Sequence, residues 1–153
     1  MRKYNLTFVL IILSVLQSCA MFDKKNTDPY KSMTEVELYN EAEIAIVPSL
    51  YEGFSLPAIE AMSCGVPLIA TTGGALPEVV GVDGVTALQV PPGDSDALTQ
   101  KISWALQQTN LRSTVGAAGR ERVMRNFSWK ITAERTVEHY RALLLETRTN
   151  AHS

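Results

Sequence analysis

Cysteine and histidine are scarce in this chain, with two of each among its 153 residues. Cys19 and Cys64 lie far apart in unlike surroundings, so the sequence predicts neither a disulfide framework nor a cysteine metal site. His139 and His152 are isolated, and we expect solvated side chains there instead of metal ligands. The formal net charge of −2 gives no electrostatic basis for binding nucleic acid.

An apolar run long enough to span a bilayer is also lacking. Two basic residues precede an apolar run over residues 6–16, which is far shorter than the ~20 apolar residues that a spanning helix needs. This pattern predicts a secretory signal peptide over residues 1–18. The run ends in Leu-Gln-Ser-Cys, which resembles the lipobox of bacterial lipoproteins and implies lipid attachment at Cys19, followed by a polar tether over residues 19–33. A buried N-terminal strand or helix with an incidental cysteine is the alternative.

The rest of the chain alternates short apolar strands with helices. We expect strands over residues 44–47, 67–70 and 86–90. Helices are expected over residues 35–42, from 56 or 57 to just before 65, over 76–80, from 94 or 95, over 111–125 and from 128 onward. Continuously apolar strands between helices predict an α/β fold with a parallel sheet covered on both faces. We expect this domain over residues 34–148, with a tail over 149–153.

Several side chains can be interpreted from helical spacing alone. Two late helices carry apolar stripes, formed by Leu98, Ile102, Ala105 and Leu106 and by Trp129, Ala133, Val137, Tyr140 and Leu144. Basic residues near the end of the chain are interpreted as solvated helix faces, with phosphate contact as the less favoured alternative: Arg120, Arg122, Arg125 and Lys130. Cys64 is interpreted as a small buried residue at a helix end, which is favoured over a nucleophile because no histidine is near in sequence.

The loop over residues 49–55 follows a strand, and ligands of parallel sheets bind beyond the carboxyl ends of strands. Ser55 can cap the next helix, and Pro57 suits its first turn because the N–H that proline lacks has no intrahelical partner there. The N–H groups of Gly53, Phe54, Ser55 and Leu56 would then point outward with the positive end of the helix dipole behind them. The sequence therefore predicts a phosphate or diphosphate site at this turn.

Two glutamates flank this predicted anion site. A carboxylate beside the anion would be repelled, so we expect Glu52 to turn aside and accept hydrogen bonds from uncharged hydroxyls, such as those of a sugar. Glu60 lies within the following helix, where a solvated or salt-bridged glutamate is the ordinary explanation. The pair by itself carries almost no evidence for function.

The whole segment that begins at Pro48 is far more specific, because it reads Pro-Ser-x-x-Glu-Gly-Phe-x-Leu-Pro-x-x-Glu-Ala-Met-x-x-Gly-x-Pro. It resembles the retaining glycosyltransferases of family 4, which have the two-domain GT-B architecture. Further matching segments are Gly73–Val80, Val90–Asp94, Gly119–Val123 and Phe127–Trp129. The resemblance covers about residues 37–145 and implies a partial, Rossmann-like C-terminal domain of such an enzyme.

This resemblance implies a nucleotide-diphospho-sugar donor, an unidentified acceptor, a cytoplasmic setting, and no cofactor or divalent metal. Glu52 would be the catalytic residue that contacts donor-sugar hydroxyls, and Glu60 would bind the ribose. The backbone of Gly53, Phe54, Ser55 and Leu56 would bind the diphosphate. Family members also carry an arginine and a lysine that clamp the diphosphate, and these are not in this chain, so we expect the isolated chain to be catalytically inactive.

The first ~43 residues resemble a different family. Asp28-Pro29-Tyr30 and residues 37–43, placed after a tether, resemble the start of BamD-type outer-membrane assembly lipoproteins. This implies a lipid anchor in the outer membrane, where a nucleotide sugar would not be available. We therefore expect a chimera joined between about Thr34 and Ile46; a non-catalytic envelope lipoprotein is the alternative function. A sheet without its first strands would leave an unpaired edge, which favours aggregation or dimer formation.

Overall fold

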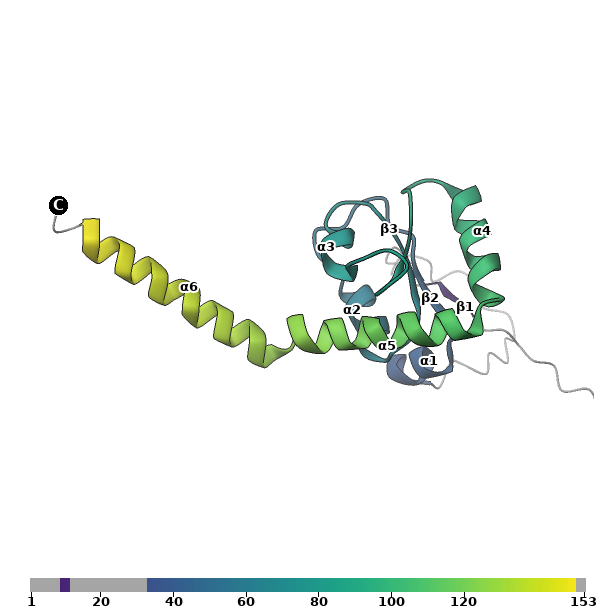
Figure 1. Ribbon diagram of the computed structural model, residues 1–153, viewed down its shortest axis with the longest axis horizontal. Coiled ribbons are helices and arrows are strands. Elements are labelled where there is room, and N and C mark those ends of the chain that lie inside the picture. Colours follow the sequence, from purple (N-terminus) through teal and green to yellow (C-terminus); the bar gives the residue numbers. More distant parts are fainter. Residues whose placement is uncertain (1–8, 12–32, 151–153) are drawn as a thin grey trace, which may run out of the picture.

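The protein is described by a computed structural model that covers residues 9–11 and 33–150 (Figure 1). Its centre is a parallel sheet with the strand order β1-β2-β3-β4. The strands are β1 (Val9–Ile11), β2 (Ile44–Val47), β3 (Leu68–Thr71) and β4 (Leu88–Val90). The helices are α1 (Glu35–Glu41), α2 (Leu56–Ser63), α3 (Leu76–Val80), α4 (Ser95–Leu106), α5 (Thr109–Asn126) and α6 (Trp129–Asn150). The predicted α/β class and parallel sheet are confirmed.

The expected elements occur in the expected order, and their ends differ by a few residues. The clearest difference is β4, which begins at Leu88 and not at residue 86. Thr86 is used in the preceding turn, where its hydroxyl accepts from the N–H of Val82 at 3.0 Å and donates to the carbonyl of Val80 at 2.6 Å. Asp94 caps α4 as predicted, because its side chain accepts from the N–H of Ala97 at 2.8 Å.

Strand β1 lies inside the segment predicted to be a signal peptide. It pairs in parallel with β2, with Val9 opposite Ile44 and Ile11 opposite Ile46. β2 is therefore not the edge strand that the sequence led us to expect. Cys19 and the predicted tether lie outside the described residues, so processing and lipid attachment stay predictions. None of the helices in residues 33–150 combines the length and apolar content that crossing a bilayer would require.

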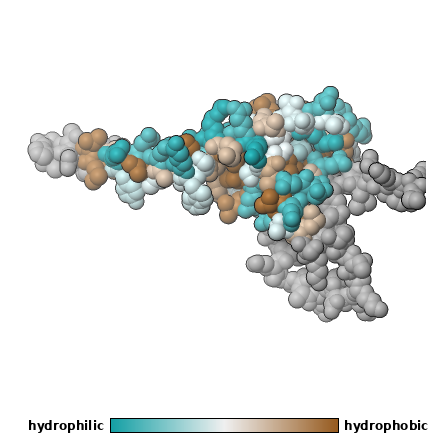
Figure 2. Space-filling view, turned by 90° about the horizontal axis from the view of Figure 1, so that it is seen from below, coloured by the Kyte–Doolittle hydropathy of each residue, from teal (hydrophilic) through white to brown (hydrophobic). Residues whose placement is uncertain are grey.

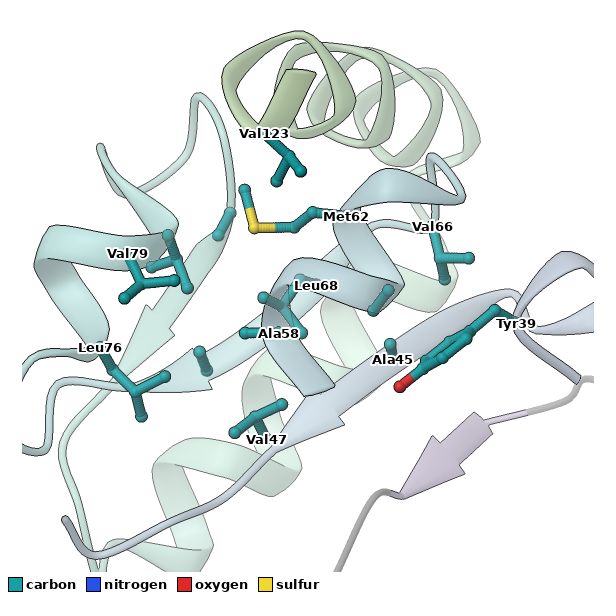
Figure 3. Packing of buried hydrophobic residues seen from close by; sticks show 14 residues of the cluster. Tyr39, Ala45, Val47, Ala58, Met62, Val66, Leu68, Leu76, Val79 and Val123 are labelled. Atoms are coloured by element: carbon teal, nitrogen blue, oxygen red, sulfur yellow. The ribbon is translucent and has the colours of Figure 1, made fainter. Parts of the chain in front are cut away.

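Both faces of the sheet are buried, as the apolar strands predict. Alternate residues of the strands point to opposite faces. On one face, Ala45, Val47, Leu68 and Ala70 pack with buried residues of α2, α3 and α5 (Figure 3). On the other face, the strands pack against the α4 stripe and Val115 of α5; the strand residues are Ile44, Ile46, Ile69, Leu88 and Val90. The predicted packing stripe of α4 is thus part of the core.

The stripe on α6 is not buried. Trp129 is 89 % exposed and Tyr140 is 66 % exposed. Figure 1 shows α6 extending away from the sheet and the other helices, and it meets the rest of the fold mainly at the end of α5. His139 on this helix is exposed, as expected, whereas His152 lies outside the described residues.

Helix α5 packs closely against α2, and two of its glycines make this possible. A methyl group at Gly116 would collide with the carbonyl oxygen of Gly65, and one at Gly119 would lie 2.8 Å from the carbonyl oxygen of Thr86. Backbone atoms cannot move aside as a flexible side chain can, so these positions tolerate no larger residue.

We expect Gly116→Ala to lower the free energy of unfolding by about 2 kcal/mol, although alanine favours a helix interior by ~1 kcal/mol over glycine. The expected loss reflects the collision with the turn at Gly65. Urea denaturation followed by circular dichroism measures it, with the exposed position Ser113→Ala on α5 as the control. A Gly116→Ala protein as stable as the wild type would show that α5 can move away from α2 without cost.

Candidate functional site

The candidate site is formed where the loop after β2 meets the loop after β3. Glu52 forms an isolated parallel bridge with Gly74, and the N–H of Ala75 donates to the carbonyl of Glu52 at 2.7 Å. A side chain at Gly73 would collide with the carbonyl of Leu50, and one at Gly74 with that of Glu52. Gly74 also has a φ of +64°, which other residues rarely adopt. The two glycines therefore permit the close contact between the loops.

Glu52 is held from one side by Ser49. The Ser49 hydroxyl donates to Oε1 of Glu52 at 2.8 Å. The carbonyl of Ser49 in turn accepts from the hydroxyl of Thr71, a buried residue at the end of β3. The carboxylate is thus oriented by hydrogen bonds that begin in the sheet, while the half-buried side chain keeps contact with solvent. This connection to the sheet could not be derived from the loop sequence.

Ser55 occupies the N-cap position of α2 but does not cap it. An N-cap serine accepts from the N–H of the second or third helical residue. Here the second helical residue is Pro57, which has no N–H, and the Ser55 hydroxyl does not reach the third. The capping prediction is therefore wrong, whereas the placement of Pro57 in the first turn is confirmed.

The Ser55 hydroxyl has an unusual environment. The residue is completely buried, and within the described part of the chain its Oγ atom has no hydrogen-bond partner. Leaving a buried hydroxyl unpaired costs about 1–3 kcal/mol. Such a group needs an explanation, and a ligand atom that pairs with it is one.

Backbone donors lie next to this hydroxyl in the chain. Within residues 33–150, no acceptor takes a hydrogen bond from the N–H groups of Gly53, Phe54, Ser55 or Leu56. Gly53 is exposed and has open space where a side chain would be. The ring of Phe54 contacts Phe127 edge to face, with centroids 5.9 Å apart and an interplanar angle of 68°. This contact ties the donor loop to the end of α5.

Glu60 lies on α2, is half-buried, and forms no salt bridge with any residue that the structure describes. Tyr39 of α1 is buried, and its hydroxyl lies 3.5 Å from Oε2 of Glu60 and 3.3 Å from the carbonyl of Pro57. Figure 3 shows the Tyr39 ring extending along the sheet beside Ala45. The donor role of Tyr39 could not be seen in the sequence, because the two residues are joined only by the packing of α1.

The electrostatic environment raises the pKa of Glu60 above its usual value. Burial is the largest cause, and the nearby carboxylate of Glu35 adds to it, while the Tyr39 hydrogen bond acts in the opposite direction. Burial together with the charges of Glu60 and Glu35 also raises the pKa of Tyr39, so its hydroxyl remains protonated and able to donate. Glu60 is therefore a carboxylate held in place at the edge of the core.

The basic side chains do not all conform to the prediction. Arg120 donates to the carbonyl of Ser63 at the end of α2, and Arg122 donates to the carbonyls of Val79 and Glu78 at the end of α3. Both arginines bind carbonyls at helix ends. Arg120 is nevertheless exposed, as predicted, whereas Arg122 is half-buried, so its assignment to a solvated face is wrong. Arg125 and Lys130 are exposed, as predicted, each paired with a glutamate one helical turn away. Cys64 is the C-cap of α2, at a helix end as predicted, but it is half-buried and not fully buried.

Known proteins share this architecture. A family described as "Glycosyl transferases group 1" matches residues 28–122. The "MMP alpha-(1->4)-mannosyltransferase" of Mycolicibacterium hassiacum is 48% identical over 103 residues, which cover 67% of this chain and 25% of that protein. Sucrose-phosphate synthase from Thermosynechococcus elongatus superposes with a TM-score of 0.65 and 40% identity, over 72% of this chain and 28% of that one. Anabaena Alr3699/HepE, solved in complex with UDP-glucose, has a TM-score of 0.64 and 23% identity, over 69% of this chain and 29% of that one, and supports the fold alone.

The chain thus spans about a quarter of the length of the relatives that it matches. The family match begins at residue 28, inside the segment that resembles an assembly lipoprotein. None of these relatives supports that resemblance or the expected chimera. The family match at residues 28–122 includes both loops, α2 and the strands β2, β3 and β4. This chain belongs to the group 1 glycosyl transferases, with the parallel α/β architecture expected of a GT-B domain.

Proposed function

We propose that residues 33–145 bind a nucleotide-diphospho-sugar, with the diphosphate at the N-terminus of α2. The observation that carries this proposal is the fully buried Ser55 hydroxyl without a partner, next to backbone N–H groups that donate to nothing else in the described chain. An anion oxygen would accept from these donors and from the positive end of the helix dipole. Membership in the group 1 glycosyl transferases, with 48% identity to a mannosyltransferase over 103 residues, supports this choice of ligand.

The two glutamates would then recognise hydroxyl groups on either side of the diphosphate. Glu60 is four residues after Leu56, which places it roughly 6 Å along the helix axis from the first turn. That spacing suits a ribose attached to a phosphate at the helix end. Glu52, oriented by Ser49, would accept from hydroxyls of the donor sugar. No divalent metal is needed for this arrangement.

The same geometry argues against sugar transfer by this chain alone. Arg112 pairs with Glu43 at 3.1 Å, while Arg120 and Arg122 bind helix-end carbonyls. These cations are engaged away from the N-terminus of α2. Charge on a departing diphosphate would then be stabilised by N–H groups without a cationic clamp, and electrostatic stabilisation is usually the largest catalytic contribution. We therefore propose a donor-binding domain that is incomplete as a catalyst.

Binding can be measured by isothermal titration calorimetry with UDP, GDP and ADP. We expect at least one of them to bind, and Ser55→Ala to weaken it about tenfold, the effect of one hydrogen bond to a charged group. Because Ser55→Ala also removes an unpaired buried hydroxyl, the variant should be at least as stable as the wild type in urea. Glu60→Gln should weaken binding similarly, whereas the exposed Glu121→Gln should not. Failure of all three nucleotides to bind the folded protein would refute the proposal.

The affinity should depend on pH through Glu60. Its carboxylate accepts more strongly from ribose hydroxyls when it is ionised, so affinity should fall as the pH falls through its raised pKa. Glu35→Gln removes a neighbouring negative charge, lowers that pKa and moves the loss of affinity to lower pH. A dideoxyribose nucleotide diphosphate is the control ligand, because its pH dependence contains only the phosphate contribution. An identical shift for both ligands would exclude a ribose contact by Glu60.

Sugar transfer by the isolated chain should be undetectable. The test is a coupled assay for nucleoside diphosphate release with a panel of nucleotide sugars and a broad set of acceptors. A protein that binds UDP in the calorimeter but gives no product would match the expectation. Product formation that Glu52→Gln abolishes would show instead that the N–H groups suffice without a cationic clamp.

A further inference from the structure

Helix α4 and the outer edge of strand β4 form the walls of a groove, called here the outer groove. Its volume is about 420 Å³, within the range of roughly 300–1,000 Å³ that is usual for small-molecule sites. Residues 89–91 at the end of β4 form one wall, and the other is formed by Ala97, Gln100, Lys101 and Trp104. These α4 residues lie three, four and seven positions after the first, the spacing of a single helix face. The candidate nucleotide site uses none of them.

Surface hydropathy alone does not mark a ligand site on this protein. On the face of the molecule shown in Figure 2, hydrophobic patches lie between hydrophilic ones. Single exposed apolar side chains are normal for a folded protein and need no partner. The outer groove differs because it combines a hollow shape with an aromatic ring and several polar groups, which is the combination found in ligand sites.

The edge of β4 beside this groove is closed to a further strand. The N–H of Gln89 donates to Oδ1 of Asp83 at 2.7 Å, and the carbonyl of Ala87 accepts from the N–H of Gly84 at 2.8 Å. Pro91 has no N–H to donate. A partner strand would need these groups for its ladder of hydrogen bonds. A peptide therefore cannot extend the sheet here, and the groove suits a different kind of ligand.

The outer groove presents an aromatic ring beside hydrogen-bond donors and acceptors. Trp104 is 45 % exposed, and Nζ of Lys101 lies 5.8 Å from the centroid of its ring. Lys101 forms no ion pair with any residue that the structure describes, and Gln100 is exposed. The carbonyl of Gln89 lies on the same outer side of β4 as its N–H. An ammonium and an indole N–H can thus donate, a carbonyl can accept, and an amide can do both.

A saccharide matches these groups better than other classes of ligand do. The C–H groups on one face of a pyranose ring pack against an aromatic ring, while its hydroxyls both donate and accept hydrogen bonds. A nucleic acid would meet a single cation in this groove, on a chain with a net charge of −2. A purely apolar ligand would cover Lys101 and the Gln89 carbonyl without pairing them, which is costly.

A second hollow adjoins the outer groove, since Val90 and Pro91 line both. It has a volume of about 190 Å³ and reaches Leu50, which lies two residues before Glu52. The two hollows together extend from α4 to the loop that carries Glu52. A chain of sugar units fits this elongated shape better than one compact molecule does.

We propose that the outer groove binds a short, uncharged oligosaccharide, with one sugar ring against Trp104 and its hydroxyls bound by Lys101, Gln100 and the Gln89 carbonyl. This chain belongs to a family of glycosyl transferases, so saccharides are ligands that it encounters. The groove is open to solvent, and a dissociation constant on the order of 1 mM is expected. The groove lies outside the proposed nucleotide site, and the inference does not depend on nucleotide binding.

The fluorescence of Trp104 provides a direct test. The chain has two tryptophans, so Trp129→Phe leaves Trp104 as the only one. We expect maltotriose or α-linked mannotriose, titrated through the millimolar range, to change the Trp104 emission until it saturates. Glycerol at equal concentrations is the control and should leave the emission unchanged, because it has hydroxyls but no ring to pack against the indole.

Calorimetry of variants then locates the site. Trp104→Ala should weaken trisaccharide binding about tenfold, and Lys101→Met about threefold. Trp129→Ala is the matched control, since it makes the same truncation at the other tryptophan, and it should have no effect. Both groove variants change side chains at the surface, so their unfolding in urea should remain close to that of the wild type. Trp104→Ala should also bind UDP as the wild type does.

Three results would overturn the inference. The first is failure of both trisaccharides to bind a wild-type protein whose circular dichroism shows that it is folded. The second is trisaccharide binding that neither Trp104→Ala nor Lys101→Met weakens, because the site would then lie elsewhere. The third is tighter binding of the anionic trigalacturonate than of the neutral trisaccharides, lost at high salt, since that would make the groove an anion site.

Discussion

The backbone contact between the loops after β2 and β3 is the constraint on which the candidate site depends. Gly73 and Gly74 allow the second loop to lie directly against the carbonyls of Leu50 and Glu52. The bridge from Glu52 to Gly74 then fixes the path of the chain into α2. The N–H groups and the Ser55 hydroxyl that are proposed to bind the anion follow within the next four residues. The loops are in turn held by the sheet, because the Thr71 hydroxyl at the end of β3 binds the carbonyl of Ser49.

Two features of α2 are unfavourable in the folded protein by itself. Ser55 buries a hydroxyl that no described group satisfies, and Glu60 is a carboxyl whose pKa is raised by burial and by Glu35. Between the usual pKa of a glutamate and this raised value, the folded state retains a proton that the unfolded chain has released, so stability falls as pH rises through that window. Both features lie on the same short helix, at and just after its N-terminus. Unfavourable features such as an unpaired hydroxyl and a carboxyl with a raised pKa often cluster at binding sites, because a bound ligand compensates for them.

The sequence predicted the elements well because their signals are local. The apolar runs of β2 and β3 permit only buried strands, and Pro57 and Gly65 delimit α2. The site loop was located for the same reason. The assignment of Arg122 to a solvated face failed because the carbonyls that it binds, those of Val79 and Glu78, are more than 40 residues away in sequence. The connection of Tyr39 to Glu60 likewise exists only because α1 packs on α2. The absence of a capping hydrogen bond from Ser55 could be predicted from the sequence, because Pro57 has no N–H to donate to a capping serine.

Helix α6 shows that helical spacing predicts an apolar stripe but does not predict whether that stripe is buried. Its spacing specifies a helix with an apolar seam as clearly as that of α4, yet α4 is covered by the sheet and α6 is not. An apolar stripe shows that a helix face suits burial, but it does not identify the surface that covers this face. For α4 that surface is the sheet of the same domain.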